Sequence, residues 1–240
     1  MHCITSESGQ SFLRGQKKIY KKMKDSVIVL SGGLDSVTLL YERKDEIELA
    51  ISFNYGGNHN KRELKCADYH CTALGIKHIT IPLSFIKKYF VSSLLQGGNA
   101  VPDGRDNEQS QMSTIVPFRN GIMLSIACGI AESNGLKKVF IASQAGGYTF
   151  YPDCRADFIK AMSEAMQKGT YENVIIEAPY TNMSKGEIAV IGKRLHLDYT
   201  TTYSCYKGGE KHCGKCRTCI KRREALAFAG ITDNTEYEDV

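Results

Sequence analysis

The chain has 240 residues, of which 42% are hydrophobic and 24% are charged, a composition that excludes a disordered or fibrous protein. No run of eighteen apolar residues occurs, which excludes a membrane span. The net charge of +5 lies within residues 1–24, which carry six basic side chains and one acidic one, so the other 216 residues carry 25 of each sign. This balance argues against nucleic acid as a partner.

Residues 1–22 contain no continuous apolar stretch of the kind found in secretory signals. Met23 opens the string Met-Lys-Asp-Ser-Val-Ile-Val-Leu, which resembles a natural start just ahead of a buried strand. We therefore expect residues 1–22 to be a disordered basic extension or an upstream start.

The first predicted strand, Val27–Leu30, leads into the most specific pattern in the sequence, Ser31-Gly32-Gly33-Leu34-Asp35-Ser36. A helix that begins after these glycines would present its first amide groups to an anion, and the serine hydroxyls would add donors. Asp35 suits Mg²⁺ or a backbone amide better than bare phosphate. The pattern is neither a Walker loop nor a dinucleotide fingerprint. It resembles the PP-loop of the ATP pyrophosphatases; the alternative is a plain strand-to-helix turn rich in small residues.

Apolar runs and helical repeats then alternate along the chain, which is typical of a parallel sheet covered by helices. The expected strands are Glu48–Asn54, Lys77–Pro82, Lys138–Ala142 and Val174–Glu177, and the expected helices carry apolar repeats within residues 64–74, 158–166 and 188–195. Gly75 and Gly135 stand where two of the helices should end. Residues 96–114 are rich in Gly and polar side chains with little periodicity, and we expect a mobile loop near a site there.

Nine cysteines are present: five are scattered, and four crowd into the segment that contains Cys205, Cys213, Cys216 and Cys219. Scattered single cysteines with one cluster favour a reducing cytoplasm and a metal site over a disulfide scaffold. Four thiolates suit a closed tetrahedral Zn²⁺ site with a structural role. An iron–sulfur cluster is the main alternative. His212 is surplus to a four-cysteine site, and we expect it to be a neighbour only.

The expected architecture is a single α/β domain with a Rossmann-like parallel sheet and a small C-terminal zinc-binding region. Residues 23–199 would form the nucleotide-binding domain, and residues 200–240 the four-cysteine region packed on it.

Four segments together resemble the 7-cyano-7-deazaguanine synthase family. They occur in order along residues 26–235: the PP-loop, Val116-Pro117-Phe118-Arg119-Asn120-Gly121, Tyr151-Pro152-Asp153-Cys154-Arg155, and the Cys205 to Cys219 array with Arg222-Arg223-Glu224-Ala225. The resemblance implies a fold of the adenine nucleotide α-hydrolase type. It also implies a ligase that forms a carbon–nitrogen bond, converting 7-carboxy-7-deazaguanine and ammonia into 7-cyano-7-deazaguanine on the route to queuosine. ATP would adenylate first the carboxylate and then the amide. The family further suggests a homodimer.

The resemblance assigns roles residue by residue. Catalytic roles fall to Asp35, Ser36 and Lys185; ATP binding to Leu30, Ser31, Gly32, Gly33, Leu34, Asp35, Ser36 and Arg119; substrate binding to Asn120, Tyr151, Asp153 and Arg155; and the metal to Cys205, Cys213, Cys216 and Cys219. Tyr55, Phe118 and Tyr151 are candidates to stack on a base, although aromatic side chains near motifs are more often core. Cys154 is expected to pack, since the chemistry needs no thiolate.

Two departures from the family concern the substrate end. Residues 144–150 lack the acidic side chain that relatives carry ahead of the Tyr151 segment, and Gly57 stands where a Gln is usual. The alternatives are therefore a paralogue that adenylates a related carboxylate for another amine, and a tRNA-modifying PP-loop enzyme.

Overall fold

The computed structural model describes residues 24–104, 108–144 and 151–238. The expected N-terminal extension and most of the segment ahead of Tyr151 lie outside these residues. The strands are β1 Ser26–Val29, β2 Ile47–Asn54, β3 Lys77–Pro82, β4 Lys138–Ile141 and β5 Ile175–Glu177; the helices are α1 Leu34–Glu42, α2 Asn60–Leu74, α3 Ser84–Tyr89, α4 Glu108–Ser113, α5 Arg119–Ser133, α6 Ala156–Gly169, α7 Lys185–Arg194 and α8 Arg217–Phe228. Short 3-10 turns cover Pro152–Cys154 and Tyr199–Thr201.

The five strands form one parallel sheet in the order β3-β2-β1-β4-β5. The sequence predicted all five strands to within one residue at each end. β1 lies at the centre, paired with β2 on one edge and β4 on the other. A strand in this position is covered on both faces, which explains its continuous apolar run Val27, Ile28 and Val29.

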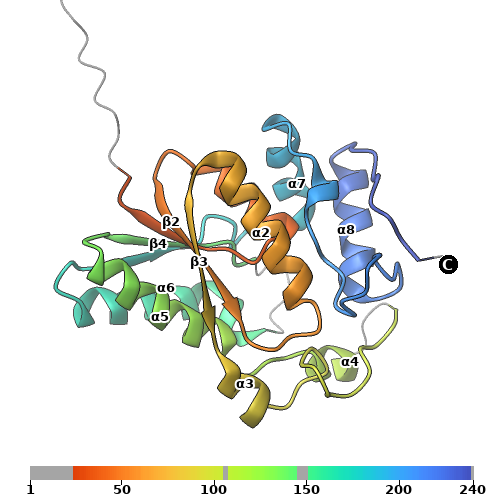
Figure 1. The fold of residues 1–240 in the computed structure, drawn as a ribbon, viewed down its shortest axis with the longest axis horizontal. Coiled ribbons are helices and arrows are strands. Elements are labelled where there is room, and N and C mark those ends of the chain that lie inside the picture. The colour runs from red at the N-terminus through yellow and green to blue at the C-terminus, as the bar shows by residue number, and fades with distance from the viewer. Residues whose placement is uncertain (1–23, 105–107, 145–150, 239–240) are drawn as a thin grey trace, which may run out of the picture.

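Alternate β1 residues enter two different cores because successive side chains of a strand point to opposite faces. Val27 and Val29 pack with α5 and α6. Ile28 and Leu30 pack with α1, α2, α7 and α8. Figure 1 shows α5 and α6 on the opposite side of the sheet from α2. Because α8 shares a core with α1 and α7, the four-cysteine segment is tied directly to the sheet domain.

Segment 96–114 was expected to be a loop throughout, but its C-terminal part forms helix α4. The sequence Glu-Gln-Ser-Gln-Met-Ser has no apolar periodicity, so no pattern predicted this helix. The preceding residues run beside the cysteine segment: the amide of Gly104 donates to the carbonyl of Lys215, and Asp103 forms an isolated bridge with Cys216.

Among the described residues, every helix is too short or too polar to cross a bilayer.

Candidate functional site

Hydrogen bonds to the hydroxyl groups of Ser31 and Ser36 fix the conformation of the PP-loop. The Ser31 and Ser36 side-chain oxygens lie 2.9 Å apart, and the amide of Gly32 donates to Ser36 Oγ at 3.2 Å. Gly33 is the N-cap of α1 and offers no side chain, so the first amides of the helix stay available to a ligand. The arrangement places amide and hydroxyl groups together at the carboxyl end of β1, where they can bind an anion.

Position 32 requires a glycine because the PP-loop and α2 approach each other closely there. Its φ is +89°, and a Cβ built on it would lie 2.1 Å from the carbonyl oxygen of Glu63. No other side chain fits there without moving the backbone. The first turn of α2 is thereby fixed against the PP-loop.

Asp35 and Lys185, both predicted as catalytic, lie face to face although 150 positions separate them. Lys185 Nζ donates to Asp35 Oδ2 at 2.5 Å. Lys185 opens α7, whose start is fixed by a reciprocal capping box between Ser184 and Glu187. Asp35 Oδ1 is buried and has no hydrogen-bond partner among the described residues. One oxygen of this carboxylate is therefore engaged and the other is free to bind a cation.

A cavity of about 610 Å³ opens from the PP-loop. Of the sequence-predicted site residues, its wall includes Leu30, Ser31, Gly33, Leu34, Asp35, Ser36, Arg119, Asn120, Tyr151 and Lys185. Gly32, Asp153 and Arg155 are outside this wall. Gly32 instead packs on α2, as described above.

Asp153 forms hydrogen bonds with Asn120 at the start of α5. Its Oδ2 accepts from the amide of Asn120 at 2.9 Å, while Asn120 Nδ2 donates back to the carbonyl of Asp153 at 3.1 Å and to Cys154 Sγ at 3.3 Å. Asp153 thus satisfies the N-terminus of α5, a favourable place for a carboxylate. Cys154 is half-buried in this contact, in keeping with a packing role.

Arg119 is a half-buried cation in the cavity wall. Its NH1 donates to Tyr55 Oη at 3.1 Å, and the guanidinium lies over the Tyr55 ring, 5.4 Å from its centroid. Burial by itself would lower the pKa of Arg119, but Tyr55, Tyr206 and Asp153 outweigh it and the pKa is raised. Arg119 therefore remains charged where it lines the cavity.

Two of the three aromatic candidates line the cavity and one does not. Tyr55 and Tyr151 line the cavity. Phe118 does not: it holds a left-handed conformation with φ 51°, is 56% exposed, and meets Phe158 edge to face. The expectation that Phe118 stacks on a base in this cavity is not supported by its position.

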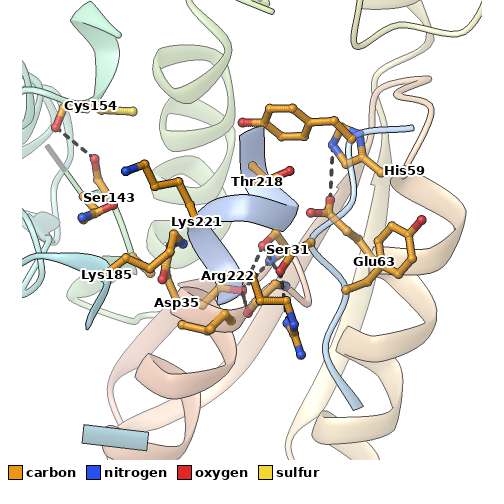
Figure 2. A pocket seen from close by; sticks show the side chains of 18 of the residues that line it. Ser31, Asp35, His59, Glu63, Ser143, Cys154, Lys185, Thr218, Lys221 and Arg222 are labelled. Atoms are coloured by element: carbon orange, nitrogen blue, oxygen red, sulfur yellow. Dashed lines mark hydrogen bonds and ion pairs between the residues drawn. The ribbon is translucent and has the colours of Figure 1, made fainter. Parts of the chain in front are cut away.

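Several wall residues were not predicted from the sequence. They come from the N-terminal end of α2, the segment between Cys205 and Cys213 and the start of α8, and include His59, Glu63, Tyr206, Arg217, Thr218 and Lys221. Figure 2 shows Asp35 and Lys185 on one side of α8 and His59 and Glu63 on the other. The available signal was positional: His59 and Glu63 follow β2, at the sheet edge where ligands of α/β proteins bind.

Burial shifts the pKa values of two titratable side chains in the cavity wall, Glu63 and His59. Burial raises the pKa of Glu63 to about 8, with Arg119 opposing the shift. Burial also lowers the pKa of His59 to about 4, so its imidazole is neutral at pH 7. The two side chains are 3.7 Å apart, between His59 Nε2 and Glu63 Oε2, and His59 Nε2 lies 2.8 Å from Tyr55 Oη.

The four clustered cysteines converge on one point. Their sulfur atoms all lie within 4.8 Å of one another, and all four side chains are buried. Cys216 Sγ is 3.5 Å and Cys213 Sγ 3.9 Å from Cys219 Sγ, and the amides of Cys213 and Cys216 point at sulfur atoms. This donor set can hold a metal ion. His212 accepts from the amide of Ser204 and stacks on Tyr203, so it is a neighbour, as expected.

The metal site and the cavity share a helix. Cys216 is the N-cap of α8 and Cys219 lies in its first turn, while Arg217, Thr218 and Lys221 of the same turns face the cavity. The cysteines therefore fix one wall of the cavity.

Fold and site together define a Rossmann-like α/β protein of the PP-loop type with a four-cysteine centre. Residues 25–230 match the family model described as "Queuosine biosynthesis protein QueC". The chain belongs to this family.

Named relatives agree with this assignment. The chain is 56% identical over 218 residues to a 7-cyano-7-deazaguanine synthase of Porphyromonas gingivalis strain W83, covering 91% of this chain and 99% of the relative. It is 48% identical over 217 residues to the enzyme of that name from Desulfotalea psychrophila, covering 90% and 99%. Among solved structures, NMN synthetase from Francisella tularensis aligns with a TM-score of 0.48 at 15% identity, covering 87% of this chain and 78% of that one.

Proposed function

We propose that this chain is an ATP-dependent ligase that converts 7-carboxy-7-deazaguanine and ammonia into 7-cyano-7-deazaguanine, for queuosine biosynthesis in the cytoplasm. Family membership and the names of its relatives support the reaction. The structural observation that carries the proposal is that the PP-loop opens into the same cavity as an aromatic and basic wall formed by Tyr55, Tyr151 and Arg119. A nucleotide and a flat heterocycle can meet there.

The reaction explains why phosphate binding and heterocycle binding share one cavity. A carboxylate resists attack by ammonia because its leaving group would be oxide. Transfer of AMP from ATP to the carboxylate oxygen releases pyrophosphate and replaces oxide by AMP as the leaving group; ammonia then displaces AMP and loses a proton to give an amide. A second transfer of AMP from ATP, to the amide oxygen, releases another pyrophosphate and allows loss of AMP and protons to form the nitrile. Both steps need the heterocycle's substituent held beside the α-phosphate of ATP.

Phosphate binding falls to the start of α1. The first amides of α1 with the Ser31 and Ser36 hydroxyls would bind pyrophosphate, and Lys185 and Lys221 would balance its charge. Asp35 Oδ1, buried and without a partner among the described residues, fits the oxygen-donor chemistry of Mg²⁺. Bound Mg²⁺ would neutralise phosphate charge.

The substrate would lie against the other wall. Tyr55, Tyr151 and Tyr206 offer aromatic surface, Asn120 offers an amide, and Arg119 offers a cation for an oxyanion. Asp153 and Arg155 stay proposed substrate residues; Asp153 would also hold Asn120 in this wall through its hydrogen bonds to the start of α5. Ammonia as the amine and a homodimeric assembly are further parts of the proposal.

We assign Zn²⁺ to the four-cysteine centre. Four thiolates at about 2.3 Å from one ion would lie roughly 3.8 Å apart, close to the 3.5 and 3.9 Å separations observed. A [4Fe–4S] cluster places each thiolate on a different iron, and a [2Fe–2S] cluster divides the four between two irons, so either needs a wider set of sulfur positions than a single ion. With all four positions taken by protein, the ion would be structural.

The test is turnover. Purified protein is incubated with ATP, Mg²⁺, ammonium and 7-carboxy-7-deazaguanine, and nucleotide and purine products are followed by mass spectrometry. We expect two AMP for each nitrile formed, and none without ammonium. AMP with only an amide, or ATP binding with no turnover, would move the search to a different acceptor. Zinc is checked by elemental analysis of the same sample.

A further inference from the structure

Three carboxylates of the described residues line the cavity: Asp35, Glu63 and Glu224. Asp35 is held by Lys185 at 2.5 Å, and Glu224 by Lys221 at 2.9 Å. Glu63 has no Lys or Arg within ion-pair distance among the described residues; its polar neighbour is the neutral imidazole of His59, 3.7 Å away. Glu63 is thus the carboxyl group of this wall that no ion pair satisfies.

The position of Glu63 is fixed and its side chain is enclosed. The carbonyl of Glu63 occupies the position that a Cβ on Gly32 would take, so the first turn of α2 packs directly against the PP-loop. The side chain is only 17% exposed. A carboxyl group so enclosed needs hydrogen-bond partners, and a ligand in the cavity is positioned to supply them.

The surroundings of Glu63 are aromatic. Tyr55 and Tyr206 line the same wall, and the His59 ring lies 6.1 Å from Tyr55 and 5.7 Å from Tyr206 between centroids. Aromatic surface with one carboxyl group suits a planar heterocycle whose amino edge lies in the plane of the ring. A phosphate would be repelled by the carboxylate form.

We propose that Glu63 binds the amino-bearing edge of a planar heterocycle in this cavity, as a specificity-determining residue. This inference rests on the proposed function, which supplies two such rings: the adenine of ATP and the 7-deazaguanine. They differ in the pattern they present. The guanine edge carries two N–H donors and requires a carboxylate; the adenine edge carries one acceptor and one amino donor and requires the neutral acid.

Two substitutions separate these sources. Glu63→Gln keeps one acceptor and one donor, so it can still pair with an adenine edge but loses one bond to a guanine edge. Glu63→Ala removes both bonds in either case. Asp68→Asn is the control, an exposed carboxylate one turn further along α2. Melting curves confirm that each variant is folded before binding is measured.

Binding is measured by calorimetry at pH 7 with Mg²⁺-ATP, with 7-cyano-7-deazaguanine, and with its analogue lacking the 2-amino group. The product nitrile avoids turnover during the titration. If Glu63 reads the guanine edge, Glu63→Gln and removal of the 2-amino group should each weaken binding about ten- to a hundredfold, and their effects should not add. If it reads adenine, Glu63→Ala should weaken ATP binding by a similar factor while Glu63→Gln retains it.

Proton exchange gives a second readout. The groups facing Glu63 are His59 at the N-cap of α2, Cys66 on α2, Arg119 from α5 and Tyr55 after β2. With its pKa raised to about 8, Glu63 is mainly protonated at pH 7. Binding of a guanine edge should release close to one proton from the wild type and none from Glu63→Gln, whereas adenine should release none. Titrations in two buffers of different ionisation enthalpy measure this number.

Unchanged affinity for both ligands in Glu63→Ala would overturn the inference. So would a defect confined to the dependence on Mg²⁺ or ammonium, since Glu63 would then serve the metal or the amine. If the wild type fails to produce the nitrile, the proposed function is at fault, and the ATP titrations still decide the role of Glu63.

Discussion

At the scale of single residues, Asp35 divides its carboxylate between two tasks. Oδ2 is engaged by Lys185, and Oδ1 is buried without a described partner. We expect Asp35→Ala to reduce ATP cleavage by at least a hundredfold, because cation binding and the placement of Lys185 are lost together. The melting temperature should change little, since the Asp35 side chain is 21% exposed and lies at the cavity edge.

The measurement is AMP release alongside a melting curve. Asp35→Asn is the matched control, because it preserves volume and hydrogen bonding while removing charge, and it should be nearly as inactive. An unfolded Asp35→Ala protein would show that Asp35 is structural instead.

Gly32 allows a second residue-scale prediction. A Cβ there would meet the Glu63 carbonyl at 2.1 Å, whereas a Cβ on Gly75, also at positive φ, would meet no atom within 4 Å. Gly75→Ala should cost only about 1 kcal/mol, the penalty of the left-handed conformation. Gly32→Ala should lower the melting temperature much further and weaken ATP binding, because backbone has to move. Equal melting temperatures for the two variants would contradict this packing.

At the scale of elements, α8 is where the metal site and the cavity meet. Cys216→Ser should lower bound metal and thermal stability together, since the free energy of metal binding is also folding free energy. Because Arg217 and Thr218 follow this cysteine directly, ATP-dependent activity should fall as well. Elemental analysis and melting curves test this. The control is Cys66→Ser, a cysteine outside the four-cysteine centre, and this variant should retain the bound metal. A normal melting curve for Cys216→Ser would remove the structural role of the metal.

The elements that the sequence predicted are those with a local cause. Each strand is a short apolar run, and Gly75 ends α2 in the left-handed conformation, as a C-terminal glycine should. The PP-loop was found because strand, glycines and helix are contiguous. Helix α4 was missed because its residues have no apolar face of their own.

The site was predicted only where it is contiguous in sequence. The pairing of Asp35 with Lys185, and the convergence of Glu63 with Arg119 and Tyr206, depend on how α2, α5 and the cysteine segment pack around the sheet. No local pattern encodes such contacts. The cysteine spacing was the exception, because metal chemistry dictates that four such side chains meet.

At the scale of the whole molecule, Glu63 and His59 link stability to pH with opposite signs. Between pH 4 and 6.5 the folded state binds fewer protons at His59 than the unfolded state, so this group favours folding as pH rises. Between pH 4.5 and 8 the folded state binds more protons at Glu63, so this group opposes folding as pH rises. Above pH 6.5, only Glu63 of these two groups still changes the free energy of unfolding with pH.

We therefore expect the melting temperature of the ligand-free protein to fall between pH 6.5 and 8, by an amount equivalent to at most about 2 kcal/mol. Glu63→Gln should flatten this part of the curve, because the substituted side chain does not titrate. Melting curves of both proteins across this range make the comparison. A parallel decline in the two proteins would assign the pH dependence to other groups.

The central place of β1 has a consequence for how the chain is made. β1 can pair with β2 soon after both are synthesised. The other edge of β1 stays unpaired until β4 is made, and β4 begins more than a hundred residues after β1 ends. Contacts across such separations form slowly. During translation the nascent chain therefore carries a half-sheet with an open apolar edge, which can pair with a neighbouring chain on the same message. Synthesis is therefore a stage at which this chain is exposed to aggregation through the edge of β1.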